Sequence, residues 1–246
     1  YENHPNDMFI NYAKQYSDMP FVIMLDEDKN GYKAGRFLRA SDLGMSGENN
    51  EWKPVIQDKL SQQLLVPNGT MGQRWEEGKK WNLKLETEDG TPIDPMLSMA
   101  ESDYHVETIQ FPYFDSSGDG IFERPIATRT IQLANGEKVK IATVYDLMTS
   151  QYGVQRFEHE LEATSYDDAS SKYTPAWQEQ ITGIKKELVT KVAKEFAQNA
   201  IDTGGRSMII MGAGINHWFN SDTIYRSILN LVLLCGCQGV NGGGWA

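Results

Sequence analysis

The stretch Gly205-Arg-Ser-Met-Ile-Ile-Met-Gly-Ala-Gly-Ile-Asn-His-Trp218 decides the fold prediction for this chain. Within it, Ser207-Met-Ile-Ile-Met211 is a mostly apolar run, which is typical of a parallel strand buried on both faces. Gly212-Ala-Gly214 follows directly and breaks the run. We therefore predict a buried strand that ends in a glycine turn.

Helices are predicted on both sides of this strand. Thr182–Ile201 is the strongest amphipathic segment, with Thr182 as a possible cap and apolar residues at a spacing of four. A second helix is expected from Asn220, Ser221 or Asp222 to about Leu234, and apolar residues around most of its circumference predict that it is buried. Helix, strand, turn and helix form a doubly wound, Rossmann-like α/β pattern.

The rest of the chain is predicted to be part of a separate α/β domain. We expect this domain at 1–181, with a long irregular insertion at about 44–123 that contains short strands and is anchored by its aromatic residues, and a cofactor-binding unit at 182–246. Asn30-Gly31 and Asn135-Gly136 lie between apolar runs and predict two β-hairpins, the second with a type I′ turn. Asn6–Tyr16, Val144–Tyr152 and a stretch opening at Lys172 read as helices.

Composition and charge exclude several classes of function. The 246 residues carry 23 Lys and Arg against 34 Asp and Glu, a net charge of −11, so we expect no nucleic-acid partner. Cys235 and Cys237 are the two cysteines, which excludes a disulfide framework and favours a reducing compartment. No run reaches about 18 apolar residues, so no transmembrane segment is expected. The chain starts without Met and stops in a glycine run, and we expect an internal piece of a larger enzyme.

The glycine turn is the main candidate binding site. Without side chains, Gly212 and Gly214 allow backbone N–H groups to approach a phosphate, and the next helix adds the positive end of its dipole. The pattern is not an NAD fingerprint, because His217 stands where the third glycine belongs and no Asp or Glu follows Asp222. A Walker A loop is also absent from the sequence.

Polar and aromatic side chains come directly after this turn. Asn216-His217-Trp218 would place an amide, an imidazole and an indole where a ligand binds, although His217 and Trp218 could instead cap the sheet edge. A second glycine cluster lies at Gly236, Gly239 and Gly242-Gly-Gly244. This density of glycine predicts a close approach of the backbone to something.

No complete catalytic or metal-binding set is present in the sequence. Asp26-Glu-Asp-Lys-Asn-Gly31 begins like a calcium loop, but Phe37 stands where a bidentate Glu is required. His159-Glu160 begins a zinc motif that Ala163 fails to complete. We therefore predict no catalytic residue and no metal ligand in this chain.

These residues resemble the catalytic alpha subunits of membrane-bound respiratory nitrate reductases, which are molybdopterin oxidoreductases of the DMSO reductase type. The resemblance is carried by Ser165-Tyr-Asp-Asp168, Tyr173-Thr-Pro-Ala-Trp177, Gln180-Ile-Thr-Gly183, the stretch Gly205–Trp218 and the glycine-rich segment from Cys235 to Ala246. It extends over essentially the whole chain and is most specific from Thr164 onward.

The resemblance implies a cofactor and partners. The parent would hold a bis(molybdopterin guanine dinucleotide) molybdenum centre and a 4Fe-4S cluster. It would reduce nitrate to nitrite with quinol-derived electrons delivered through an iron-sulfur beta subunit and a cytochrome b gamma subunit, at the cytoplasmic face of the membrane. Gly212, Ala213, Gly214, Asn216, His217 and Trp218 would lie beside the guanine dinucleotide, and Gly236, Gly239, Gly242, Gly243 and Gly244 would face the same cofactor.

The metal ligands implied by the resemblance would lie before Tyr1, and the second half of the pocket after Ala246. We therefore expect that the chain by itself neither holds cofactors nor reduces nitrate. Two alternatives stay open at this point. One is a sister molybdoenzyme that reduces selenate or chlorate-type oxyanions or oxidises an organic substrate, and the other is a non-catalytic module that contacts other subunits through the insertion.

Overall fold

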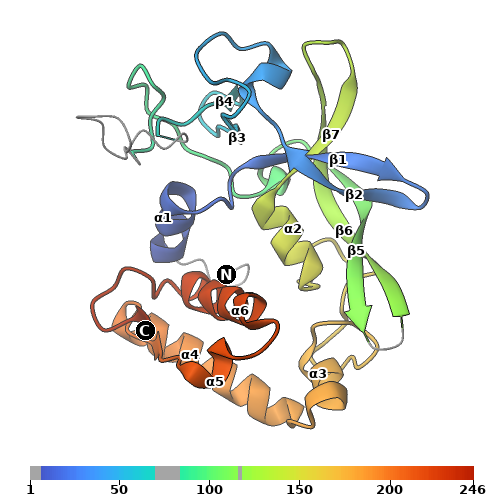
Figure 1. Ribbon diagram of the computed structural model, residues 1–246, viewed down its shortest axis with the longest axis vertical. Helices are drawn as coiled ribbons and strands as arrows, with labels where there is room; N and C mark the ends of the chain where they lie inside the picture. The colour runs from blue at the N-terminus through green and yellow to red at the C-terminus, as the bar shows by residue number, and fades with distance from the viewer. Residues whose placement is uncertain (1–6, 70–83, 116–117) are drawn as a thin grey trace. The chain divides into compact units, whose positions relative to one another are not determined.

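The computed structural model describes residues 7–69, 84–115 and 118–246 (Figure 1). The chain divides into two compact units. We call Lys14–Ile181 the barrel unit, and Tyr1–Ala13 together with Thr182–Ala246 the C-terminal unit. Helix α1 (Asp7–Tyr16) crosses the boundary between them. It confirms the predicted first helix, whose proposed cap Asn6 lies outside the described residues.

Five strands of the barrel unit close into a barrel in the order β1-β2-β5-β6-β7. Their bounds are Val22–Asp28, Gly31–Phe37, His105–Asp115, Gly118–Gln132 and Lys138–Thr143. Only β2 and β5 pair in parallel, and the other neighbours are antiparallel. The predicted mixture of helices and strands is thus confirmed, but this sheet is not a wound parallel sheet, because short hairpin loops force neighbouring strands to run antiparallel.

Both predicted hairpins are present, with turns that differ from the expectation. In the first, Asp28 pairs with Gly31, so the turn residues are Lys29 and Asn30. In the second, the Gly136 N–H donates to Leu133 O at 2.9 Å and Gly136 has φ +88°, while Asn135 keeps a negative φ. This is a type I turn followed by a left-handed glycine and not a type I′ turn, which requires positive φ at both central residues.

Apolar side chains pack on both faces of this sheet. Every barrel strand contributes to one cluster, which contains Ile109, Phe122 and Ile126 and packs against Leu147 of α2 (Val144–Gln151). A second cluster covers the other face of β1 and β7 with residues from the loops, including Leu38, Val55 and Met99. The barrel unit therefore has an apolar core of its own.

The predicted irregular insertion contains one large exception. Among its described residues before His105 the elements are short: β3 (Ile56–Gln57), β4 (Leu64–Leu65) and η3 (Met99–Glu101). The short helix η1 (Ala40–Leu43) comes just before the insertion. From His105 onward, however, β5 and β6 form the longest hairpin of the barrel. Trp52 does not anchor the insertion, because it is 59% exposed and stacks only on Arg39. Trp75 and Trp81 lie outside the described residues.

The C-terminal unit contains α4 (Lys186–Thr203), β8 (Met208–Ile209), α5 (Ala213–Asn216), α6 (Ser221–Leu234) and β9 (Gly244–Trp245). Strands β8 and β9 pair in parallel, and helices α5 and α6 lie in the connection between them. The cap of α4 is Lys185 and not Thr182, because Thr182 ends α3 (Pro175–Thr182) and Gly183 has φ +73°. Gly204 ends α4 in the left-handed conformation that glycine favours.

None of the helices in the described part of the chain combines the length and the hydropathy needed to cross a bilayer.

Candidate functional site

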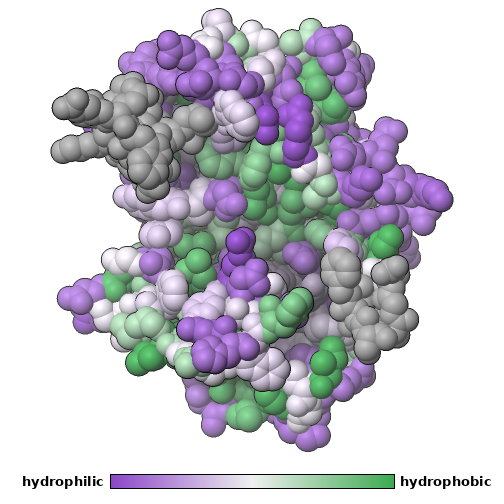
Figure 2. Space-filling model, viewed as in Figure 1, coloured by the Kyte–Doolittle hydropathy of each residue, from purple (hydrophilic) through white to green (hydrophobic). Residues whose placement is uncertain are grey.

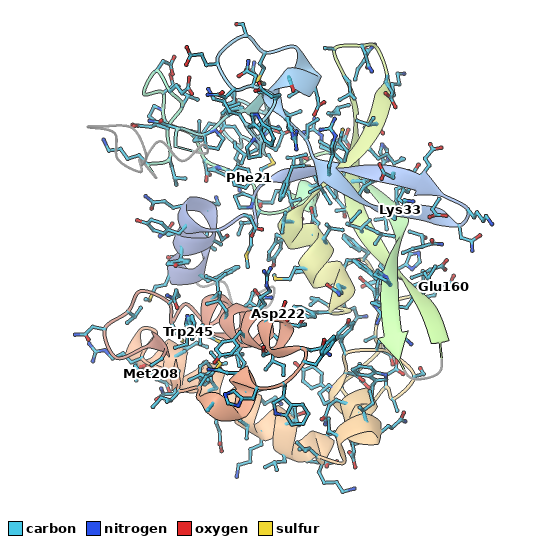
Figure 3. The ribbon with its side chains drawn as sticks, in the orientation of Figure 1. Phe21, Lys33, Glu160, Met208, Asp222 and Trp245 are labelled. Atoms are coloured by element: carbon cyan, nitrogen blue, oxygen red, sulfur yellow. The ribbon has the colours of Figure 1, made fainter. Side chains whose placement is uncertain are left out.

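The candidate site lies at the carboxyl end of the β8–β9 pair. The Ala246 N–H donates to Ile209 O at 3.0 Å, and the Met211 N–H donates to Ala246 O at 2.7 Å, so the pairing continues to the start of the glycine turn. Figure 3 labels Met208 and Trp245, one from each strand. In α/β sheets, ligands bind at the carboxyl ends of parallel strands, so the glycine turn has the expected position.

Two side chains fix β8 to α4. Asn199 Nδ2 donates to Ser207 Oγ at 2.8 Å, and Ser207 Oγ donates to Phe196 O at 2.9 Å. Ala200, Val232 and Cys237 form the small core beneath, with Phe196 and Ile209 packed against it. The position of β8, and with it the glycine turn, is therefore set by α4.

The glycine turn is open to solvent. Gly212, Ala213 and Gly214 are all exposed, and a Cβ added to either glycine would meet nothing within 4 Å. Packing among the described residues therefore gives no reason for glycine at these positions. An open surface of this kind can form one wall of a binding site for a large ligand, but it does not enclose the ligand.

The three residues after the turn are exposed as well. Asn216 ends α5, His217 is its C-cap, and Trp218 is 69% exposed. The Trp218 N–H donates to Ile215 O at 3.2 Å, which holds the backbone while the indole stays free. The structure brings these residues together with the turn, as the sequence predicted. A cap on the sheet edge by a packed Trp218 is not observed.

The second glycine cluster lies at the opposite end of the same strands, and its last member, Gly244, is the first residue of β9. A Cβ on Gly243 would lie 2.1 Å from Gly205 O, and a Cβ on Gly205 would lie 2.4 Å from Gly236 O. Gly236, Gly239, Gly242 and Gly244 all have positive φ values. The close approach predicted for this cluster is therefore made to the chain's own backbone, at least for Gly243.

Gly205 was missed by the sequence reading of the site. The signal was available, because a second glycine after the helix-ending Gly204 exceeds what a C-cap requires. In the second cluster, Gly244 pairs with Met208, which lies four residues before Gly212, a separation of roughly 13 Å in extended form. A ligand that touched both clusters would have to be at least that long.

Helix α6 and strand β8 are more exposed than predicted. Only Val232 and Leu233 of α6 are buried, and Ile210 next to β8 is 80% exposed. In the view of Figure 2, separate apolar patches appear over the part of the molecule that contains α4 and α6. The apolar pattern was read correctly, but the described residues do not cover these surfaces.

Neither cysteine is chemically activated. Burial, followed by the neighbouring Cys237, raises the pKa of Cys235 to about 11. Burial also raises the pKa of Cys237. Thiols that stay protonated are poor nucleophiles and poor metal ligands. Among the described residues, no group of three or more His, Cys, Asp and Glu is arranged to hold a metal ion.

A glycine turn at the carboxyl edge of a parallel strand pair is typical of α/β proteins that bind cofactors, and a comparison with known families specifies the class. The molybdopterin oxidoreductase family matches residues 48–246, and the chain belongs to that family. Over its whole length it is 53% identical to the nitrate reductase alpha chain of Bacillus subtilis (strain 168). The family resemblance inferred from the sequence is thus confirmed.

Other relatives agree and widen the range. The respiratory nitrate reductase 1 alpha chain of Escherichia coli (strain K12) is 42% identical over 99% of this chain. The perchlorate reductase subunit alpha of Dechloromonas aromatica (strain RCB) is 23% identical over 94% of it. In each case the chain covers 20% of the relative. The chain therefore spans about a fifth of the length of the relatives it matches.

Proposed function

We propose that this chain is a segment of the catalytic alpha subunit of a nitrate reductase, which reduces nitrate to nitrite with quinol-derived electrons. The observation that carries the proposal is the 53% identity to a nitrate reductase alpha chain over 100% of this chain. A random similarity confined to the glycine turn would not extend through the barrel unit as well.

We propose that the segment forms part of a bis(molybdopterin guanine dinucleotide) site in a protein that also holds a 4Fe-4S cluster. The molybdenum centre supplies the oxygen-atom and electron transfer when bound. Gly212, Ala213 and Gly214 would let peptide N–H groups approach the dinucleotide, and Asn216, His217 and Trp218 would offer hydrogen bonds and a stacking surface. Their exposure, and the open space beside both glycines, support this assignment.

We assign the second glycine cluster an indirect role at the same site. Gly243 packs on Gly205, and this contact sets where β9 begins relative to β8. Gly236, Gly239, Gly242 and Gly244 supply the turns that lead there. On this proposal, 182–246 is the start of a Rossmann-like wound sheet, with β8 and β9 as two of its strands, and 1–181 is a separate domain.

The partners follow from the same proposal. Beta and gamma subunits of the iron-sulfur and cytochrome b types would bring electrons to the alpha subunit at the cytoplasmic face of the membrane. Perchlorate is the second candidate substrate, because one relative is the alpha subunit of a perchlorate reductase. Its identity of 23% is less than half that of the Bacillus protein, so we favour nitrate.

Reduced-dye assays on the full-length protein test the substrate. We expect nitrate to be reduced at least tenfold more efficiently, in kcat/KM, than chlorate, perchlorate or selenate, a difference of about 1.4 kcal/mol in transition-state stabilisation. A preference for one of the other oxyanions would refute the assignment.

The site is tested by filling its open space. Gly214→Val in the full-length protein should lower the bound molybdenum and pterin, measured by elemental analysis and by pterin fluorescence after oxidation. Ala193→Val on the exposed face of α4 is the matched control, and it should leave both contents unchanged. If Gly214→Val kept its full content of molybdenum and pterin, the turn would not be part of the site. Stoichiometric molybdenum in residues 1–246 alone would contradict the proposal that this segment supplies only one wall.

A further inference from the structure

In the barrel, β1 and β7 separate from each other before either strand ends. Their ladder runs from Val22↔Thr143 to Leu25↔Lys140. Beyond that point β1 continues along β2 as far as Asp28, and β7 continues along β6 as far as Lys138. The two hairpins thus form a fork, and two strand edges face each other inside it.

The alternation of ladder hydrogen bonds shows which backbone groups face the fork. In β1, Phe21 O accepts from Val144 N, whereas Val22 O accepts from Leu38 N of the β2 side, so odd-numbered residues of β1 face β7. Between β6 and β7, the Leu133 N–H donates to Glu137 O at 2.8 Å, so even-numbered residues of β7 face β1.

Glu27 and Lys138 would therefore be the next hydrogen-bonded pair, but the ladder already ends at the pair of Leu25 and Lys140. Their N–H and C=O groups point into the fork, and none of the described residues pairs with them. Open backbone groups on two facing edges form a template for an added strand.

The walls of the fork also carry unpaired charges of opposite sign. Asp26 and Glu27 lie on the β1 wall and Lys138 on the β7 wall, all three exposed and without an ion pair to another described residue. Among the other charges at this groove, Arg36 binds Asp42 through two hydrogen bonds of 2.7 Å, and Lys140 pairs with Glu107. Glu137 accepts a hydrogen bond from Asn135 Nδ2 at 3.3 Å. In Figure 2 the hydrophilic tip of the β1–β2 hairpin projects from the surface, and Figure 3 labels Lys33 in this hairpin.

The groove between the walls has a volume of about 610 Å³. Its floor includes the half-buried side chains of Met24, Leu133 and Val139, which pack on the outer barrel core. A strand alternates its side chains between two faces, so an occupant could place apolar residues on this floor. An anionic small molecule fits less well, because Asp26 and Glu27 would repel it.

We infer that this fork is a docking slot for an extended segment of a partner polypeptide. The segment pairs its backbone with Glu27 on one side and Lys138 on the other. It carries apolar residues toward the floor, an acidic residue beside Lys138 and a basic residue beside Asp26 and Glu27. The inference rests on the proposed subunit assembly but not on the substrate that the assembly reduces.

Amide hydrogen exchange on the full-length protein, alone and in its native assembly, tests the slot. We expect the Glu27 and Lys138 amides to exchange at least about tenfold more slowly in the assembly. Lys138→Glu should abolish this protection of the Glu27 amide while the amides of Ile23 and Ala142, a pair inside the β1–β7 ladder, remain protected. Lys138→Pro removes both the N–H that faces the fork and the ammonium group, but no hydrogen bond to β6, because β6 does not use that N–H; it should also lose the protection at Glu27.

Three outcomes would overturn the inference. The two amides could exchange equally fast in both samples, or they could already be protected in the full-length protein alone, which would place a segment of the same polypeptide in the slot. Protection that survives Lys138→Glu and Lys138→Pro would show that the slot is not its cause. Dye-linked reductase activity measured on the same samples keeps a failure of this inference distinct from a failure of the proposed function.

Discussion

The barrel unit and the C-terminal unit use similar apolar residues with opposite results. In the barrel unit, Ile109 and Ile126 are buried to 1% exposure or less, inside a cluster to which every strand contributes. In the C-terminal unit, Leu188 and Val192 on α4 remain more than half exposed, and the cluster beneath β8 is built on the small side chains of Ala200, Val232 and Cys237. In the barrel every strand pairs with two neighbours, whereas each strand of the two-stranded β8–β9 sheet has one neighbour, and a parallel sheet needs further elements on both faces.

The polar groups of the two units differ in the same way. The barrel unit buries an ion pair between Arg156 and Asp146, and Ser98 and the Met99 N–H also bind this carboxylate. The ion pair of α4, Lys191 with Glu195, is 3.7 Å long and exposed to solvent. Stability of the described chain is therefore concentrated in the barrel unit, and the candidate site lies in the weaker one.

The largest expected effect comes from the buried ion pair. Asp146→Ala leaves the Arg156 guanidinium buried without its carboxylate, and we expect a loss of about 3–5 kcal/mol in the free energy of unfolding, measured by urea denaturation. Glu195→Ala should cost less than about 0.5 kcal/mol, because exposed pairs contribute little. A loss below about 1 kcal/mol for Asp146→Ala would mean that the barrel unit does not depend on this network.

The same substitution in both units sharpens the contrast in burial. Ile126→Ala should cost about 3 kcal/mol by the same measurement, because it removes a fully buried side chain and leaves a cavity. Ile210→Ala, at a position that is 80% exposed, should change stability by less than about 0.5 kcal/mol. Equal effects would show that β8 is covered in solution.

A pair of glycine substitutions separates packing from binding in the C-terminal unit. Gly243→Ala places a Cβ 2.1 Å from Gly205 O, and we expect a cost of about 2 kcal/mol. Gly214→Ala meets nothing within 4 Å and should be neutral or should stabilise by about 0.5 kcal/mol. The division of the two clusters into a packing role and a ligand-facing role fails if these effects are reversed.

The smallest expected effect concerns the thiols. With a pKa of about 11, Cys235 should react with iodoacetamide at pH 8 at least about tenfold more slowly than a free cysteine. Because the folded-state pKa is raised above the unfolded value, the protonated thiol favours the folded state below about pH 9, and this contribution is lost as the pH rises toward 11. Cys235→Ser should flatten that part of the pH profile. Rapid labelling of Cys235 at pH 8 would show that the C-terminal unit opens.

Local signals in the sequence predicted much of the fold. The helices, both hairpins and the glycine-ended α4 follow from periodicity and turn residues, which act over a few positions. The long β5–β6 hairpin was missed, because polar residues on its outer face obscure the alternation of Ile109 and Phe111 with their neighbours. The cap of α4 was placed at Thr182, but Gly183 adopts a positive φ and interrupts the helix, so α4 begins only after Lys185.

For the candidate site, the sequence by itself determined the family, the glycine turn after an apolar strand, and the polar and aromatic residues that follow it. These features are contiguous, and contiguous residues stay together in any fold. Only the tertiary structure decided that the two glycine clusters lie at opposite ends of the strand pair, and that Gly243 is required by Gly205. Only it revealed the fork between β1 and β7. Contacts between residues far apart in the chain depend on strand pairing, and a single sequence does not encode that pairing locally.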